Sequence, residues 1–152
     1  MSRSVAASGK PGDCPEEVLF VDLARTVDLL SRGPAGILRD NDLSPNQYNI
    51  LRILRGAPEG LLCGEISARM ISRDPDITRL LDRLEERGLI GRCRDNPDRR
   101  RVHVRIQDKG LALLARLDGP VCDLHRRQLG HLGRKKLRQL AELLLACSSR
   151  IA

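Results

Sequence analysis

Arginine side chains gather in two parts of this chain, and their chemistry is the binding of phosphates and base edges. Residues 73 to 105 carry 10 basic and 7 acidic side chains and residues 109 to 152 carry 9 and 3, whereas residues 1 to 44 carry 5 and 7. Three consecutive arginines, Arg99 to Arg101, follow the turn-forming residues 95 to 98. With a formal net charge of +7, this pattern predicts attraction to a polyanion, of which nucleic acid is the commonest.

The elements that would position these arginines have the order helix, turn, helix and hairpin. A capping serine and a first-turn proline predict a helix over 45 to 55. A short helix is expected over about 63 to 71, and another over 75 to 87 with Asp74 as its N-cap. The last of these helices carries an apolar stripe at helical spacing, formed by Ile77, Leu80, Leu81 and Leu84.

An antiparallel hairpin is predicted next. The second strand is indicated by three apolar residues that alternate with polar ones, Val102, Val104 and Ile106, because this alternation is the period of a strand. The turn-forming residues 95 to 98 and the three arginines that follow them come just before this strand. Residues 45 to 107 therefore have the order of a winged helix-turn-helix domain. The predicted fold class is mainly α with a small β-hairpin (α+β).

Helical segments flank this domain on both sides. Residues 16 to 44 are expected to form a helix that is kinked or interrupted at Gly33–Pro34, and residues 108 to 152 to form helices broken at Gly119–Pro120. Because the central domain has its own core, the apolar seams of these flanks are predicted to pair with a second copy of the chain in a homodimer. Residues 1 to 15 have no periodicity and are expected to form a flexible arm.

The chain resembles the MarR family of bacterial transcriptional regulators over about residues 44 to 110, from SPNQYNILRIL through ITRLLDRLEERGLIGRCRDNPDRRRVHVRIQDKG. The specific signal is the ITRLLDRLEERGLI segment, followed at the right distance by an Asp-x-Arg wing tip. The resemblance implies a homodimer that binds a palindromic operator in double-stranded DNA, most simply as a repressor. It also implies release of the DNA when a small molecule binds.

The residues that the resemblance places against DNA lie on the recognition helix and on the wing: Arg73, Asp76, Thr78, Arg79, Arg83, Asp98, Arg99 and Arg100. Among them Arg100 falls at the wing position that enters the minor groove, and Asp98 is expected to buttress it. The recognition helix opens with an acidic pair, Asp74 and Asp76, where family members commonly have small hydroxyl residues and a basic group. This pair lowers the local potential and could restrict contacts to cytosine amino groups.

A small organic effector, anionic or neutral, is expected between the dimer helices and the winged domain. The residues predicted to line its site are Phe20, Tyr48 and Leu51. Phe20 and Tyr48 are the only aromatic residues of the chain, whereas family members that bind phenolic compounds often use aromatic walls. The chemical class of the effector is therefore left open.

The five cysteines are odd in number and form no close pair, which indicates reduced thiols in the cytosol. Cys14 near the N-terminus leaves a redox-sensing regulator as one alternative. Cys122 and His125 would share a helix face, and His131 lies nearby, but these are too few ligands for a metal site.

A winged-helix module that binds protein is the other alternative, and the arginines at the hairpin tip count against it. The sequence has no phosphate-binding glycine loop and no nucleophile elbow, so we expect no catalytic residues, no enzymatic activity and no cofactor. No apolar run approaches the roughly 20 residues of a membrane-spanning helix. A cytoplasmic protein without membrane contact is therefore expected.

Overall fold

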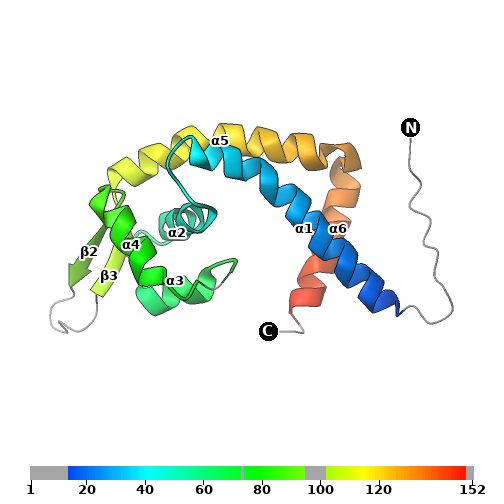
Figure 1. Ribbon diagram of the computed structural model, residues 1–152, viewed down its shortest axis with the longest axis horizontal. Coiled ribbons are helices and arrows are strands. Elements are labelled where there is room, and N and C mark those ends of the chain that lie inside the picture. The colour runs from blue at the N-terminus through cyan, green and yellow to red at the C-terminus, as the bar shows by residue number, and fades with distance from the viewer. Residues whose placement is uncertain (1–13, 73, 95–101, 150–152) are drawn as a thin grey trace. The chain divides into compact units, whose positions relative to one another are not determined.

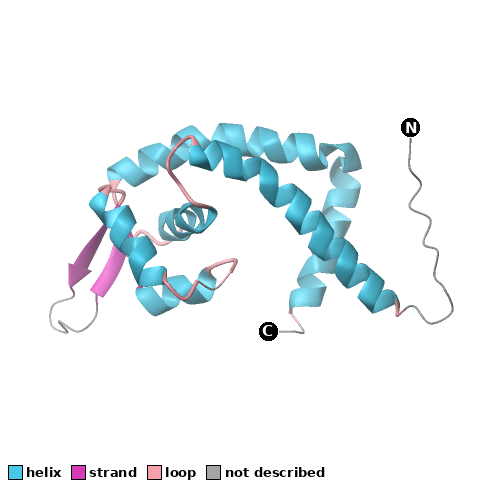
Figure 2. Cartoon of the chain, viewed as in Figure 1, coloured by secondary structure: helices cyan, strands magenta, loops and turns pink. Residues whose placement is uncertain are grey.

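The computed structural model of the chain describes residues 14–72, 74–94 and 102–149. The contacts divide the chain into two units, residues 1–33 and 34–152. Helices dominate the described residues (Figure 2), and none of the described helices is both long enough and apolar enough to cross a bilayer.

Helix α1 covers Pro15–Arg39 and continues through Gly33 and Pro34. Of the two alternatives predicted at this pair, the interruption is therefore wrong, and the kink stays a prediction. The fixed φ of proline is compatible with helix geometry, and a proline weakens or kinks a helix without always ending it. In the unit of residues 1–33 this helix exposes a set of large apolar side chains: Val18, Leu19, Phe20, Val21, Val27 and Leu29.

Helix α2, Pro45–Arg55, begins with the predicted serine cap. Ser44 Oγ accepts a hydrogen bond from the Gln47 backbone N–H at 3.1 Å, and Gln47 Oε1 accepts one from the Ser44 N–H at 2.9 Å. This reciprocal pair satisfies two backbone donors at the helix start and explains how the buried Gln47 is tolerated. The same face of α2 lies in the hydrophobic core through three fully buried side chains: Ile50, Leu51 and Leu54.

The sheet has three strands in the order β1-β3-β2, all antiparallel. The predicted hairpin is confirmed as β2, Ile90–Arg94, paired with β3, Val102–Ile106. Strand β1, Leu61–Leu62, was not predicted, because two residues are too few to show strand periodicity. It pairs with the other edge of β3 and places the start of α3, Cys63–Arg69, beside the hairpin.

Helix α4 covers Ile77–Glu86, two residues shorter at its start than predicted, and Gly88 follows it with a positive φ of 68°. Leu81 and Leu84 of the predicted stripe are buried, and Ile77 and Leu80 pack half-buried against the same core. In Figure 1 the strands β2 and β3 lie side by side next to α4, whose contacts with β2 join the helix to the hairpin.

Helix α5, Asp108–Leu129, runs through Gly119 and Pro120, so the break predicted there is wrong. The helix ends instead at a short 3-10 turn, η1, Gly130–Leu132, after which α6 covers Gly133–Ser148. The break lies at Gly133 because this residue adopts a φ of 72°, which glycine reaches without steric cost. Large side chains of α6 are exposed, as on α1: Leu140, Leu143, Leu144 and Leu145.

Two contacts hold α5 against the winged elements. A Cβ at Gly110 would lie 2.4 Å from the carbonyl oxygen of Leu89 and 2.8 Å from Ile106 Cγ1, so only glycine allows this close approach. Further along α5, Asp118 accepts two hydrogen bonds from the Arg55 guanidinium, at 2.8 and 3.1 Å. These hydrogen bonds lower the pKa of the Asp118 carboxyl group below its ordinary value.

Candidate nucleic-acid interface

Helix α4 separates its apolar and polar residues on opposite faces. Its stripe packs into the core, whereas Thr78, Arg79 and Arg83 are exposed. These three residues were predicted to face DNA, and they leave the helix on the side away from the core. A hydroxyl and two guanidinium groups on one exposed helical surface are donors suited to base edges and phosphates.

The turn before α4 is fixed by side chains of α2. Asp74 Oδ2 accepts a hydrogen bond from Asn46 Nδ2 at 2.6 Å, and its other oxygen accepts the Asp76 backbone N–H at 2.9 Å. Asn49 Oδ1 accepts the Ile71 N–H at 2.9 Å. These contacts tie the α3–α4 turn to the first turns of α2, so the start of the exposed helix has a defined position.

The N-cap of α4 is Asp76 rather than the predicted Asp74, and its side chain makes no capping hydrogen bond. Its carboxylate lies instead 3.6 Å from Arg79 Nη1, one helical turn further on. Both side chains are more than half exposed, at 58 % for Asp76 and 66 % for Arg79. The Arg79 guanidinium, which was predicted to contact DNA, is thus paired with an acid in this structure.

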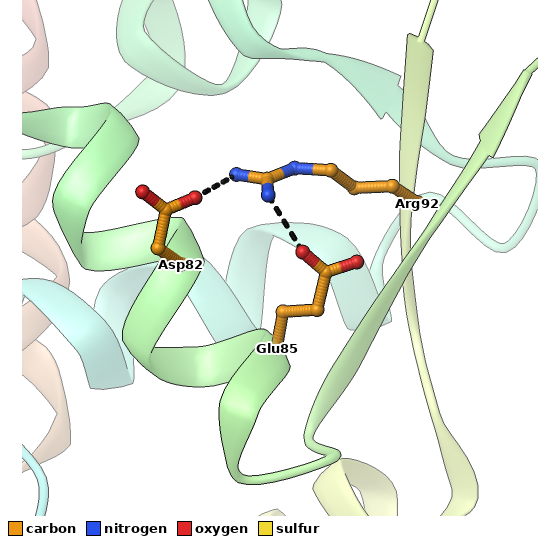
Figure 3. Close-up of polar contacts among 3 residues, drawn as sticks. All are labelled: Asp82, Glu85 and Arg92. Carbon is orange, nitrogen blue, oxygen red and sulfur yellow. Dashed lines mark hydrogen bonds and ion pairs between the residues drawn. The ribbon is translucent and has the colours of Figure 1, made fainter.

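A two-carboxylate clamp joins α4 to the hairpin (Figure 3). Arg92 on β2 donates from Nη2 to Asp82 and from Nη1 to Glu85, each at 2.6 Å. The hydrogen bond to Asp82 is the main cause that raises the pKa of Arg92 above its ordinary value. This clamp was not predicted from the sequence, because spacing along the chain does not show which carboxylates an arginine on a strand contacts.

The C-terminal end of α4 has its own anchor. The Arg87 guanidinium donates to the backbone carbonyl oxygens of Asn41, at 3.1 Å, and of Asp42. The Arg87 side chain therefore binds the α1–α2 turn. The exposed polar surface of α4 is formed by residues nearer the start of the helix.

Half of the predicted DNA contacts lie outside the described residues: Arg73, Asp98, Arg99 and Arg100. The described strands do define where the wing segment is attached. Arg94 pairs with Val102 at the end of the hairpin where residues 95–101 connect the two strands.

The residues predicted to line an effector site have separate surroundings. Leu51 is fully buried, and Tyr48 is half-buried against the core with the Arg52 guanidinium 5.9 Å from its ring centroid. Phe20 is 70 % exposed on α1, in the other unit of the chain. The structure thus gives Leu51 a packing role, and the effector site stays a prediction.

The cysteines and the possible metal ligands have surroundings that bear on the redox and metal hypotheses. All five thiols are free, and no group of three or more His, Cys, Asp or Glu side chains in the described ranges could hold a metal ion. Cys14 Sγ donates to Glu16 Oε2 at 2.8 Å, and this hydrogen bond lowers the pKa of the Glu16 carboxyl group.

Known proteins are similar to this chain in sequence and in structure. A model of the MarR family matches residues 41–101. The HTH-type transcriptional regulator TtmR of Methylorubrum extorquens (strain PA1) is 37 % identical over 87 residues, which are 57 % of this chain and 44 % of that protein. The chain therefore spans less than half of the length of this curated relative.

Solved structures match over nearly the whole chain. A MarR transcription factor from Planctomyces limnophilus is 40 % identical with a TM-score of 0.67, over 88 % of this chain and 98 % of that one. The PcaV transcriptional regulator from Streptomyces coelicolor, solved with its natural ligand, is 23 % identical with a TM-score of 0.71, over 97 % of this chain and 100 % of that one. The likeness to PcaV shows the shared fold. The likeness to the Planctomyces limnophilus protein, together with the matching family model, places this chain in the MarR family of transcriptional regulators.

Proposed function

We propose that this chain is a sequence-specific DNA-binding regulator, most simply a repressor, that binds a palindromic operator as a homodimer. The observation that carries the proposal is the exposed Thr78, Arg79 and Arg83 surface of α4, on a helix held at both ends and joined to the hairpin. A helix presented in this way fits the major groove, while a basic hairpin tip reaches the flanking backbone.

Recognition helix and wing are expected to have different tasks. Thr78 and Arg79 would contact base edges, with Arg83 and Arg73 nearer the phosphates. Arg100 would enter the minor groove, supported by Arg99 and Asp98, and would add affinity with little dependence on sequence.

Replacement of Arg79 by alanine tests the recognition helix. Removing one good base contact costs about 1 to 3 kcal/mol of discrimination per site, and a dimer carries the change twice. Arg126→Ala is a matched control, because Arg126 is also exposed and paired with an aspartate three residues away, in α5. Isotherms on a duplex selected from random DNA should show weaker and less selective binding for Arg79→Ala alone.

Replacement of Arg100 by alanine tests the wing. We expect weaker binding to the selected and to a scrambled duplex alike, and a salt slope smaller by about one for each phosphate that Arg100 neutralises. Equal affinities of Arg100→Ala and the unmodified protein on both duplexes would remove the wing assignment. A protein whose binding to duplex DNA lacks salt dependence would favour the protein-interaction module instead.

The exposed apolar faces of α1 and α6 support the dimer. Leu19 on α1 is 53 % exposed, and Leu143 and Leu145 on α6 are 65 % and 70 % exposed in the single chain. Clusters of exposed large apolar side chains on one helix are typical of interfaces. Sedimentation at micromolar concentration should give twice the chain mass of 16.9 kDa, and a persistent monomer would contradict the two-fold operator.

A small organic effector is proposed as the signal that releases DNA. PcaV, a structural neighbour, was solved with its natural ligand. This structure is a precedent for ligand binding by a protein of the same fold. A thermal-shift screen of phenolic acids and fatty acids, repeated on Tyr48→Leu, tests the idea. A ligand that raises the melting temperature of the unmodified protein but not of Tyr48→Leu would support a site near Tyr48.

A further inference from the structure

We propose that Asp76 determines specificity by holding Arg79 away from DNA phosphates, so that strong binding requires a base pair that satisfies both side chains. This inference rests on the proposed DNA-binding function and names the residue that limits binding to the wrong sequence. Its starting observation is the exposed Asp76–Arg79 ion pair at the beginning of α4.

The two aspartates that open the recognition helix have different surroundings. Both oxygens of Asp74 accept hydrogen bonds, from Asn46 and from the Asp76 backbone, so this carboxylate serves the turn itself. The Asp76 carboxylate makes no capping hydrogen bond to α4, and the group it approaches is Arg79. An N-cap aspartate normally uses its side chain on the helix amides, so the Asp76 side chain is available for another role.

Two other carboxylates of α4, Asp82 and Glu85, are neutralised from the hairpin. Asp82 and Glu85 share the Arg92 guanidinium at 2.6 Å. Asp76 differs from them because its partner, Arg79, is itself a residue placed to read DNA. Any contact between Arg79 and a phosphate would therefore leave the Asp76 charge uncompensated close to the negative backbone.

The same pair can be satisfied by a matching base pair. Arg79 can donate to the N7 and O6 acceptors of guanine, while a carboxylate accepts a hydrogen bond from the cytosine N4 amino group. On a G·C base pair, Arg79 and Asp76 then exchange their contact with each other for contacts with the two bases. Where the base pair at this position does not match, as at most sites of a random duplex, only Arg79 gains a partner and the Asp76 carboxylate faces phosphate repulsion.

The test compares Asp76→Asn with Asp123→Asn. Each substitution removes one negative charge from an exposed Asp–Arg pair spaced i, i+3, in α4 and in α5 respectively. At 0.1 M salt we expect Asp76→Asn to bind a random duplex about fivefold tighter. This factor corresponds to the repulsion between two unit charges about 4 Å apart in water, here the Asp76 carboxylate and a phosphate. Selection from random DNA should also show a relaxed G·C preference at one position of each half-site.

Binding to the selected operator should not improve in parallel, so the ratio of specific to random affinity should fall by about fivefold, at the lower end of the range of one base contact. Asp123→Asn should leave that ratio unchanged. If the two variants alter both affinities equally, the effect is general charge and the Asp76 proposal is overturned. If Asp76→Asn still changes the ratio in an Arg79→Ala background, Asp76 does not act through Arg79 and the proposal also fails.

Failure of the proposed function itself has a different signature. In that case the unmodified protein shows no selective, salt-dependent binding to any duplex, and Arg79→Ala changes nothing. Melting temperatures of both asparagine variants, measured in parallel, establish that each is folded before its isotherms are compared.

Discussion

Replacement of Arg92 by methionine would open the clamp between α4 and the hairpin while keeping most of the apolar stem. The Arg92 side chain is 29 % exposed, and Asp82 and Glu85 are 48 % and 37 % exposed. Exposed ion pairs contribute about 0.2 to 1 kcal/mol each. Two short charge-assisted hydrogen bonds from one guanidinium place the clamp at the upper end of that range, so Arg92→Met should lose about 1 to 2 kcal/mol of unfolding free energy.

The remaining carboxylates add a second effect. Asp82 and Glu85 lie one turn apart on α4, and without Arg92 their repulsion destabilises the helix by a few tenths of a kcal/mol. They also leave two uncompensated negative charges on the helix proposed to enter the groove. Arg92→Met should therefore weaken DNA binding more than its reduced stability suggests.

Urea denaturation at fixed protein concentration measures the stability, because association would otherwise shift the midpoint. Arg126→Met is the control, since its single exposed pair in α5 should contribute little. Adding Asp82→Asn and Glu85→Gln to Arg92→Met should restore part of the DNA affinity by removing the uncompensated charges. Unchanged stability and unchanged DNA binding in Arg92→Met would refute the view that the clamp couples helix and hairpin.

Three further outcomes follow from packing and charge. Leu51→Ala should cost about 2 to 5 kcal/mol in urea denaturation, because Leu51 is fully buried; an unchanged midpoint would contradict its place in the core. Gly110→Ala should cost about 1 to 3 kcal/mol through its clash with backbone, whereas Gly119→Ala, with open space at its Cβ in the same helix, should be neutral or stabilising. Asp118→Asn should lose at most about 1 kcal/mol at pH 7, since the pair with Arg55 is half exposed. Because the folded pKa of Asp118 is lowered, this difference should be present above its ordinary value of 3.8 and should vanish as pH falls through the folded pKa; a difference that persists at pH 2 would exclude the ion pair as its cause.

Patterns within one element were predictable from the sequence. The stripe of α4, the serine cap of α2 and the alternation in β3 each depend on neighbours within a few residues, and the structure bears out all three. An interruption predicted at Gly119–Pro120, and offered beside a kink at Gly33–Pro34, is absent because proline tolerates helical φ and the surrounding helices are long. The true break in the C-terminal half occurs at Gly133, whose positive φ no local pattern indicated.

Contacts between elements were beyond reach of the same patterns. Asn46 and Asp74 are 28 residues apart, and Arg92 reaches Asp82 across the α4–β2 turn. Such pairs depend on how α2, α4 and the hairpin pack, which the sequence constrains only through the buried residues. The acidic opening of the recognition helix illustrates the point, since the sequence showed two aspartates but not their different partners.

The charges of the winged domain point to a division of labour between its two proposed contact regions. Residues 74 to 87, which contain α4, carry 5 acidic and 3 basic side chains, whereas residues 92 to 105 carry 6 basic and 2 acidic ones. A helix segment with a net negative charge cannot supply the attraction to DNA, because nonspecific affinity scales with the phosphates that cations neutralise. Affinity should therefore come from the hairpin and its arginines, and the recognition helix should act mainly by rejecting sequences that leave its carboxylates unpaired. On this basis Arg100→Ala should lower the salt slope of binding without a change in sequence preference, whereas Asp76→Asn should relax the sequence preference.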